Sequence, residues 1–220
     1  MSTSGESEPD EGAAPSGRAF GWRTVARWLG IACLITASGI AGYLGWLLWG
    51  TGLETKHQQS VLADRFQTEL NQIHPGAPRP PDSGRLPLAG DVYGELVIQR
   101  IDLDMYVVQG TSYEDLKSGP GHYLDSADPW SDRGRVGIAG HRTTYLAPFW
   151  NLQEMRPGDP IVLRTTRGTF HYSVDRVFVM PEATAGVVLD PTAQPTLVLT
   201  TCNPRFSASE RLIVTADRVG

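Results

Sequence analysis

The 220-residue sequence has little cysteine, since Cys33 and Cys202 are its only two. Two thiols cannot form the disulfide framework of a small secreted domain. The chain also lacks excess positive charge: its formal net charge is −5, which gives no reason to expect a nucleic-acid partner. No two histidines have the spacing of metal ligands, and Cys202 has no neighbouring thiol, so a zinc site is not expected. Asp125, Asp128 and Asp132 lack the glycine and glutamate of an EF-hand loop, so we expect neither a metal nor a cofactor.

Aromatic residues are absent from residues 1–17, which are small, polar and acidic. Such a segment cannot bury enough surface to fold, so residues 1–27 are predicted to form a disordered cytoplasmic tail. Charge is absent from residues 28–49, a run of 22 residues. A helix of that length spans the roughly 30 Å hydrocarbon core of a bilayer.

A cleavable signal peptide is the alternative interpretation of residues 28–49. Its apolar region would be shorter and would end in small residues, whereas this segment ends in Trp-Leu-Leu-Trp-Gly. We therefore expect a retained single-pass anchor. Arg18, Arg23 and Arg27 precede it, and the positive-inside rule then places the N-terminus in the cytoplasm and the remainder outside the cell.

Residues 50–90 are predicted to connect the anchor to a globular domain. Residues 52–73 are rich in helix formers and contain no proline, so they are expected to form a helical stalk. Residues 74–90 contain five prolines and three glycines, a composition typical of a semi-rigid spacer. The globular domain is therefore predicted to cover residues 91–220.

The apolar runs of this domain are short, β-branched and bounded by Gly, Pro, Asp or Asn, as strands are. The predicted strands are residues 93–98, 105–108, 136–139, 161–165, 169–179, 196–201 and 212–215. Two short helices are expected at 112–117, with Ser112 as N-cap and Asp115 as its partner, and at 147–153. Seven or eight strands with few helices favour a closed barrel or a sandwich.

Cys202 lies at the end of an apolar strand, where Pro204 stops the ladder. A thiol at such an end can be exposed for nucleophilic attack, although a lone cysteine is often buried and inert. Arg211 begins the next strand, and if the two strands are antiparallel neighbours it faces the thiol across about 5 Å. A guanidinium there could favour the thiolate or hold an oxyanion; the alternative is a solvated arginine at a strand end.

His141 follows another short apolar strand after Gly140. Cysteine chemistry needs a group that takes and returns a proton near pH 7, and imidazole does so with little tuning. His141 is therefore the candidate acid and base.

The sequence closely resembles the sortases, the transpeptidases that attach surface proteins to Gram-positive cell walls. The resemblance covers the chain from about residue 91 onward, and its motifs occur in the family's order. They are Gly119-Pro-Gly-His122, Gly137-Ile-Ala-Gly-His141-Arg, Phe149-Trp-Asn-Leu with Gly158-Asp159, Leu199-Thr-Thr-Cys202 and Arg211-Leu-Ile-Val. The fold it implies is an eight-stranded β-barrel, which agrees with the strand count.

The resemblance implies a role for each site residue. Cys202 corresponds to the family nucleophile, His141 to its acid/base and Arg211 to its substrate and oxyanion arginine. Thr201 matches a threonine that helps hold the sorting peptide. The segments 140–145 and 201–204 look most like the class E enzymes of high-GC Gram-positive bacteria, which act on Leu-Ala-x-Thr-Gly signals. Tyr145 is expected to narrow the pocket for the second residue of that signal.

The implied function is cleavage of a C-terminal sorting signal between Thr and Gly, through a thioacyl enzyme, with transfer to a cell-wall precursor amine. The implied partners are surface proteins with sorting signals, a lipid II-like amine and the membrane. Two alternatives remain at this point: an L,D-transpeptidase-like peptidoglycan enzyme, although its Ser-His-Gly-Cys run is missing, and a non-catalytic anchored β-domain that binds surface proteins.

Overall fold

The structure, a computed structural model, describes residues 21–46, 50–72 and 88–219. The predicted tail up to residue 20, the last residues of the predicted anchor (47–49) and most of the predicted spacer (73–87) lie outside the described residues. Most of helix α1 (Trp22–Gly45) belongs to a first compact unit that ends at Tyr43, and the chain from Leu44 onward forms a second. By length and composition α1 can cross a membrane, and it begins six residues earlier than the predicted anchor.

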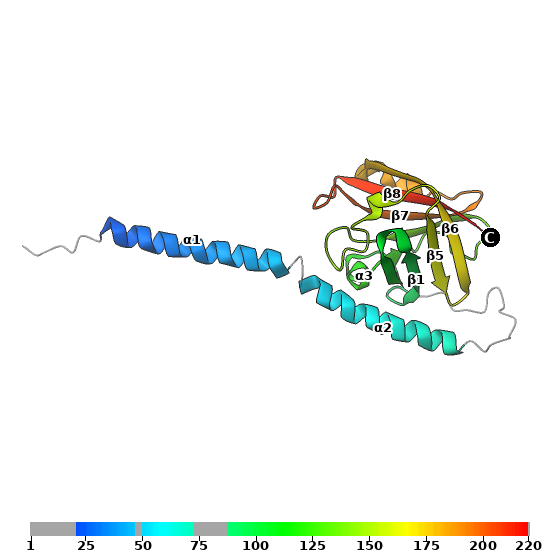
Figure 1. The fold of residues 1–220 in the computed structure, drawn as a ribbon, viewed down its shortest axis with the longest axis horizontal. Coiled ribbons are helices and arrows are strands. Elements are labelled where there is room, and N and C mark those ends of the chain that lie inside the picture. Colours follow the sequence, from blue (N-terminus) through cyan, green and yellow to red (C-terminus); the bar gives the residue numbers. More distant parts are fainter. Residues whose placement is uncertain (1–20, 47–49, 73–87, 220) are drawn as a thin grey trace, which may run out of the picture. The chain divides into compact units, whose positions relative to one another are not determined.

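The second unit contains a closed barrel of eight strands (Figure 1). The strands are β1 (Val92–Ile98), β2 (Leu103–Gln109), β3 (Gly121–His122), β4 (Gly134–Ala139), β5 (Pro160–Thr165), β6 (Gly168–Pro181), β7 (Pro195–Asn203) and β8 (Glu210–Arg218). Their order around the barrel is β1-β2-β3-β4-β7-β8-β6-β5, and β5 pairs with β1 to close it. Closure leaves no edge strand exposed. The prediction of an eight-stranded barrel is confirmed.

Alternation along β7 and β8 separates an inner face from an outer one. Leu197, Leu199 and Val214 belong to the main core inside the barrel. Val198 and Ile213 point outward, where Val188 of the 3-10 helix η4 (Glu182–Leu189) covers them. This alternation decides which face each polar residue at the end of the two strands occupies.

Helix α2 (Thr51–Gln72) is the segment predicted as a helical stalk. It is a helix, but it packs on the barrel instead of standing apart: Leu62 and Phe66 are buried against Val92 of β1. The Gln59 side chain accepts a hydrogen bond from the Tyr106 N–H at 2.8 Å and donates one to the Tyr106 carbonyl at 2.9 Å. The domain boundary at residue 91 stays a prediction.

Three further short helices complete the described part of this unit: α3 (Tyr113–Ser118), η2 (Gln99–Ile101) and η3 (Leu152–Glu154). Helix α3 has the predicted capping box between Ser112 and Asp115. The helix predicted at 147–153 was wrong, because Ala147 adopts a left-handed φ of 45° and the chain turns there before η3 begins.

Candidate active site

Cys202 and Arg211 are direct Cα partners across the antiparallel pair β7–β8. Partners in such a pair project on the same face of the sheet. Cys202 is four residues after Val198 and Arg211 is two residues before Ile213, so by alternation they share the outward orientation of those residues. Their side chains therefore project from the outer face of the barrel at the end of the two strands. Cys202 is a free cysteine and is half-buried. The pairing that the nine-residue spacing predicts is therefore present.

His141 arrives from the other neighbour of β7. Strand β4 runs parallel to β7, with Ala139 opposite Thr200, and the Gly140 N–H donates to the Thr200 carbonyl at 3.1 Å. In a parallel pair the residues that follow two partners stay side by side, so His141, two residues after Ala139, lies at about the level of Cys202, two residues after Thr200. The topology thus brings Cys202, His141 and Arg211 to adjoining strand ends.

Thr201 lies on the opposite face of β7 from Cys202 and is buried inside the barrel. Its hydroxyl donates a 2.7 Å hydrogen bond to the carbonyl of Gly140, the residue before His141. The Thr201 side chain therefore ties the strand that carries the imidazole to the strand that carries the thiol. Its predicted contact with substrate stays a prediction.

The His141 ring is enclosed by two tyrosines. Its centroid lies 4.9 Å from the Tyr145 ring and 6.4 Å, edge-on, from the Tyr113 ring. The Nε2 atom is buried and has no hydrogen-bond partner among the residues that the structure describes. Burial lowers the pKa of the imidazole, which favours the neutral form. A neutral imidazole with an unused nitrogen is suited to accept or donate a proton.

Tyr145 begins a strained loop beside His141. Tyr145, Leu146 and Ala147 all have positive φ values of 53°, 61° and 45°, which non-glycine residues adopt at a cost. The Tyr145 N–H donates to the Thr51 hydroxyl at 3.3 Å, so the first turn of α2 helps to hold the loop. The phenol pairs with the Tyr113 hydroxyl at 2.9 Å, and this hydrogen bond raises the pKa of Tyr145 to about 12.

Arg142 was not predicted as a site residue, although it follows His141 directly. Its buried guanidinium donates to the Cys202 carbonyl and the Asn203 Oδ1 atom, each at 3.0 Å, and to the Gln153 Oε1 atom at 3.0 Å. Burial, and then repulsion from Arg205, lowers the pKa of Arg142, while the nearby Cys202 opposes that change. Arg142 ends the motif of residues 137–142, but the motif alone gives it no role, and the tertiary contacts show what it holds.

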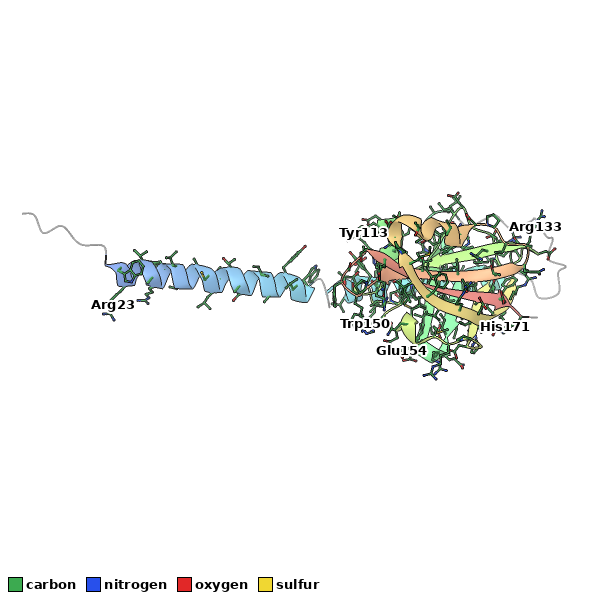
Figure 2. All side chains as sticks on the ribbon, turned by 90° about the horizontal axis from the view of Figure 1, so that it is seen from above. Arg23, Tyr113, Arg133, Trp150, Glu154 and His171 are labelled. Atoms are coloured by element: carbon green, nitrogen blue, oxygen red, sulfur yellow. The ribbon has the colours of Figure 1, made fainter. Side chains whose placement is uncertain are left out.

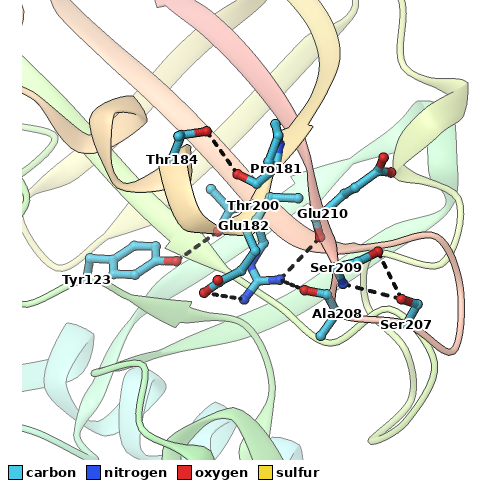
Figure 3. A network of polar contacts seen from close by, with 10 residues as sticks. Tyr123, Pro181, Glu182, Thr184, Thr200, Ser207, Ala208, Ser209 and Glu210 are labelled. Carbon is cyan, nitrogen blue, oxygen red and sulfur yellow. Dashed lines mark hydrogen bonds and ion pairs between the residues drawn. The ribbon is translucent and has the colours of Figure 1, made fainter.

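The Arg211 guanidinium has three acceptors, and Figure 3 labels the residues that supply them, Glu182, Ala208 and Glu210. It donates to the Ala208 carbonyl at 2.9 Å and the Glu210 carbonyl at 3.2 Å, and it pairs with Glu182 of η4 at 3.4 Å. A guanidinium has five N–H donors, so some remain for a substrate. These contacts hold the cation on the face that carries Cys202.

A thiol, an imidazole and a guanidinium at adjoining strand ends can perform acyl transfer through a covalent intermediate. Within the described ranges of the chain, no cluster of three or more His, Cys, Asp or Glu residues could hold a metal ion. The barrel and its site therefore point to a cysteine-dependent acyl-transfer enzyme as the class.

The sortase-domain family model matches residues 96–219, and the chain belongs to the sortase family of cysteine transpeptidases. This membership decides among the three interpretations of the sequence in favour of the transpeptidase. Helix α1 fits the membrane anchoring of such an enzyme.

Two relatives among the curated proteins illustrate the similarity. Sortase D of Bacillus subtilis is 30% identical over 200 residues, which cover 86% of this chain and 98% of that protein. Sortase SrtE1 of Streptomyces coelicolor is 28% identical over 188 residues, which cover 78% of this chain and 51% of that protein.

The chain is also similar to solved structures of sortases. The crystal structure of sortase E1 from Streptomyces coelicolor, with a tripeptide in its active site, is 31% identical. It has a TM-score of 0.56 and matches 60% of this chain and 90% of its own. Sortase E from Streptomyces avermitilis is 33% identical, with a TM-score of 0.53 over 60% of this chain and 91% of its own.

Proposed function

We propose that Cys202 is the nucleophile of this transpeptidase, His141 its acid and base, and Arg211 the donor that stabilises the oxyanion. The observation that supports this most is the shared outer face of Cys202 and Arg211, with His141 at the end of the parallel neighbour β4. The substrate is a C-terminal sorting signal of the Leu-Ala-x-Thr-Gly type, as the resemblance of residues 140–145 and 201–204 to the class E enzymes implies.

In the first half-reaction the Cys202 thiol gives its proton to His141, and its sulfur attacks the Thr carbonyl carbon of the signal. A C–S bond forms, and the negative charge that develops on the carbonyl oxygen is stabilised by donors of Arg211. The Thr–Gly C–N bond then breaks, and the His141 imidazolium gives its proton to the leaving glycine amine. The products of this half are a thioacyl enzyme, a neutral His141 and a released C-terminal peptide.

In the second half-reaction an amine of a lipid II-like cell-wall precursor attacks the thioester carbonyl. His141 takes the proton of the attacking amine, an amide bond forms, and the Cys202 sulfur leaves as thiolate. The neutral form of His141, which burial favours, is the form that this step requires. The product is a surface protein joined to the precursor.

Tyr145 sets the preference for the second residue of the signal. Its ring lies 4.9 Å from the His141 ring, so it borders the reacting centre. A phenol held there by Tyr113 leaves room for Ala and disfavours the bulkier, rigid Pro. The difference turns on a few carbon atoms, so it is modest, about 1–3 kcal/mol.

The test is a cleavage and transfer assay with Leu-Ala-x-Thr-Gly and Leu-Pro-x-Thr-Gly peptides and a glycine-based amine. We expect the amine to be joined to the fragment that ends in Thr, with the Leu-Ala peptide preferred. Tyr145→Ala should bring the two kcat/KM values together, and Tyr145→Phe, which keeps the ring, should retain most of the preference. Cleavage at another bond contradicts the proposed signal, and an unmoved ratio in Tyr145→Ala removes Tyr145 from substrate choice.

A further inference from the structure

An exposed group of large side chains surrounds the end of the barrel that carries the site. Phe206 is 72% exposed and Leu53 69%, and Leu146 and Trp150 are also exposed. We call these four residues and Arg205 the apical patch. Figure 2 shows Trp150 and Tyr113 at one end of the barrel, with Arg133 and His171 at the other.

Three segments carry the apical patch, and the loop with Leu146 and Trp150 contacts the other two. A Cβ placed on Gly52, next to Leu53, would lie 3.2 Å from the Leu146 side chain. The Trp150 and Phe206 rings meet edge to face at 6.2 Å, and the Arg205 guanidinium lies 4.1 Å from the Trp150 ring centroid. The loop that carries Leu146 and Trp150 is closed by a 2.9 Å hydrogen bond from the Trp150 N–H to the Ala147 carbonyl. This loop therefore links the first turn of α2 to the β7–β8 loop.

Its composition suits the boundary between a bilayer and water. Trp and Phe beside an arginine place apolar area in the acyl region and a cation at the phosphates. Arg205 donates to the Trp150 carbonyl at 3.0 Å, and no carboxylate lies within ion-pair distance of it among the described residues. Its charge is thus free to meet a lipid phosphate.

The length of the connecting chain keeps this patch near the membrane. Only residues 46–50 separate the last residue of α1, Gly45, from the first residue of α2, Thr51. Even fully extended, six Cα steps reach about 20 Å. If α1 spans the bilayer, Leu53 is therefore held close to the headgroups, and the neighbouring Gly52 lies against Leu146 of the loop that carries Trp150.

We propose that the apical patch docks on the outer surface of the membrane that α1 crosses, with Trp150 and Phe206 at headgroup level and Arg205 on a lipid phosphate. Docking holds Cys202 where a lipid-linked amine is presented. This consequence rests on the proposed function, whereas the docking itself does not. A second copy of the chain on the same patch is the competing occupant.

A fluorescence measurement on the full-length chain tests the docking. In a Cys33→Ala, Cys202→Ala background, a nitrobenzoxadiazole dye is attached through Ala208→Cys, two residues from Phe206, or through Arg133→Cys at the other end of the barrel. Each protein is placed in nanodiscs that hold one chain and carry doxyl-labelled lipids. We expect blue-shifted, quenched emission at position 208 and neither effect at 133, and Trp150→Ser with Phe206→Ser should reduce the quenching. Equal quenching at the two positions overturns the proposal, as does a blue shift that appears only with two chains per disc.

An activity measurement separates the docking from the proposed function. Leu53→Ser with Phe206→Ser, in the otherwise wild-type chain, should transfer a sorting peptide to a soluble glycine amine at the normal rate. The same variant should transfer several-fold more slowly to an amine carried on a lipid in the same nanodisc. Equal rates on the lipid-borne amine overturn the docking, whereas no transfer by the wild type to either amine overturns the proposed function instead.

Discussion

Arg211 carries the part of the site that depends most on side-chain shape. Three acceptors, the carbonyls of Ala208 and Glu210 and the carboxylate of Glu182, hold its planar group at the end of β8, where the Cα of Arg211 pairs with that of Cys202. A lysine keeps the charge but cannot satisfy all three acceptors and a substrate oxygen as well.

We therefore expect Arg211→Lys to be nearly as inactive as Arg211→Ala, with kcat lowered on the order of 10²–10³-fold, as for the loss of one oxyanion donor. Steady-state kinetics on a sorting peptide measure this, and Arg133→Lys, far from the site, is the matched control. A lysine variant with near-normal kcat shows that the fork of donors is not needed.

Arg142 links the His141 loop to the backbone of the nucleophile. Its removal leaves the Cys202 carbonyl and the Asn203 amide oxygen without a buried donor, so Arg142→Met should lower the free energy of unfolding by about 2–4 kcal/mol. It should also lower kcat, because the strand end moves. Gln153→Ala removes only the third acceptor, so it should lower the unfolding free energy and kcat by less. Denaturant unfolding and kinetics measure both, and wild-type values for Arg142→Met contradict this role.

The two-residue strand β3 closes the barrel between β2 and β4 around a buried histidine. His122 stacks on the Tyr93 ring at 4.0 Å, and its nitrogens contact Gln109 Oε1 at 3.1 Å and Ser126 Oγ at 3.0 Å. Burial lowers the pKa of His122 to about 4. The unfolded chain binds this proton below about pH 6.5, so protonation favours unfolding.

The contribution of His122 to the unfolding free energy should therefore be constant above about pH 6.5. It should fall by up to about 3 kcal/mol as the pH drops from about 6.5 toward 4. His141, whose pKa burial also lowers, acts in the same direction. Thermal melting between pH 7 and pH 4 measures the loss. His122→Gln should flatten the dependence, and His171→Gln on the exposed face of β6 should not; identical slopes in all three proteins would refute the assignment.

At the scale of elements, periodicity predicted seven strands because each is long enough to show β-branched runs between turn residues. Strand β3 was missed because two residues carry no period. The helix at 147–153 was wrong because buried Phe149 and the left-handed Ala147 impose a turn that local propensity does not favour. Cys202, His141 and Arg211 were predicted from strand ends, whereas the contacts of Arg142 depend on three segments that only folding brings together.

At the scale of the whole molecule, α1 and the three arginines before residue 28 predict an orientation. We propose that the N-terminus is cytoplasmic and the catalytic unit extracellular, because cytoplasmic flanks carry the excess of Lys and Arg. Protease added to intact protoplasts should then degrade the catalytic unit and spare an epitope placed at the N-terminus. Protection of the catalytic unit, with degradation after lysis as the control, reverses the orientation.

The central claim is a covalent thioacyl bond between Cys202 and the Thr carbonyl of a sorting signal. Intact-protein mass spectrometry, after brief mixing with a Leu-Ala-x-Thr-Gly peptide and no amine, tests it most directly. The predicted result is an added mass equal to the fragment ending in Thr, mapped to Cys202, lost with hydroxylamine and absent from Cys202→Ala. An adduct on Cys33, or turnover that persists in Cys202→Ala, would contradict the account.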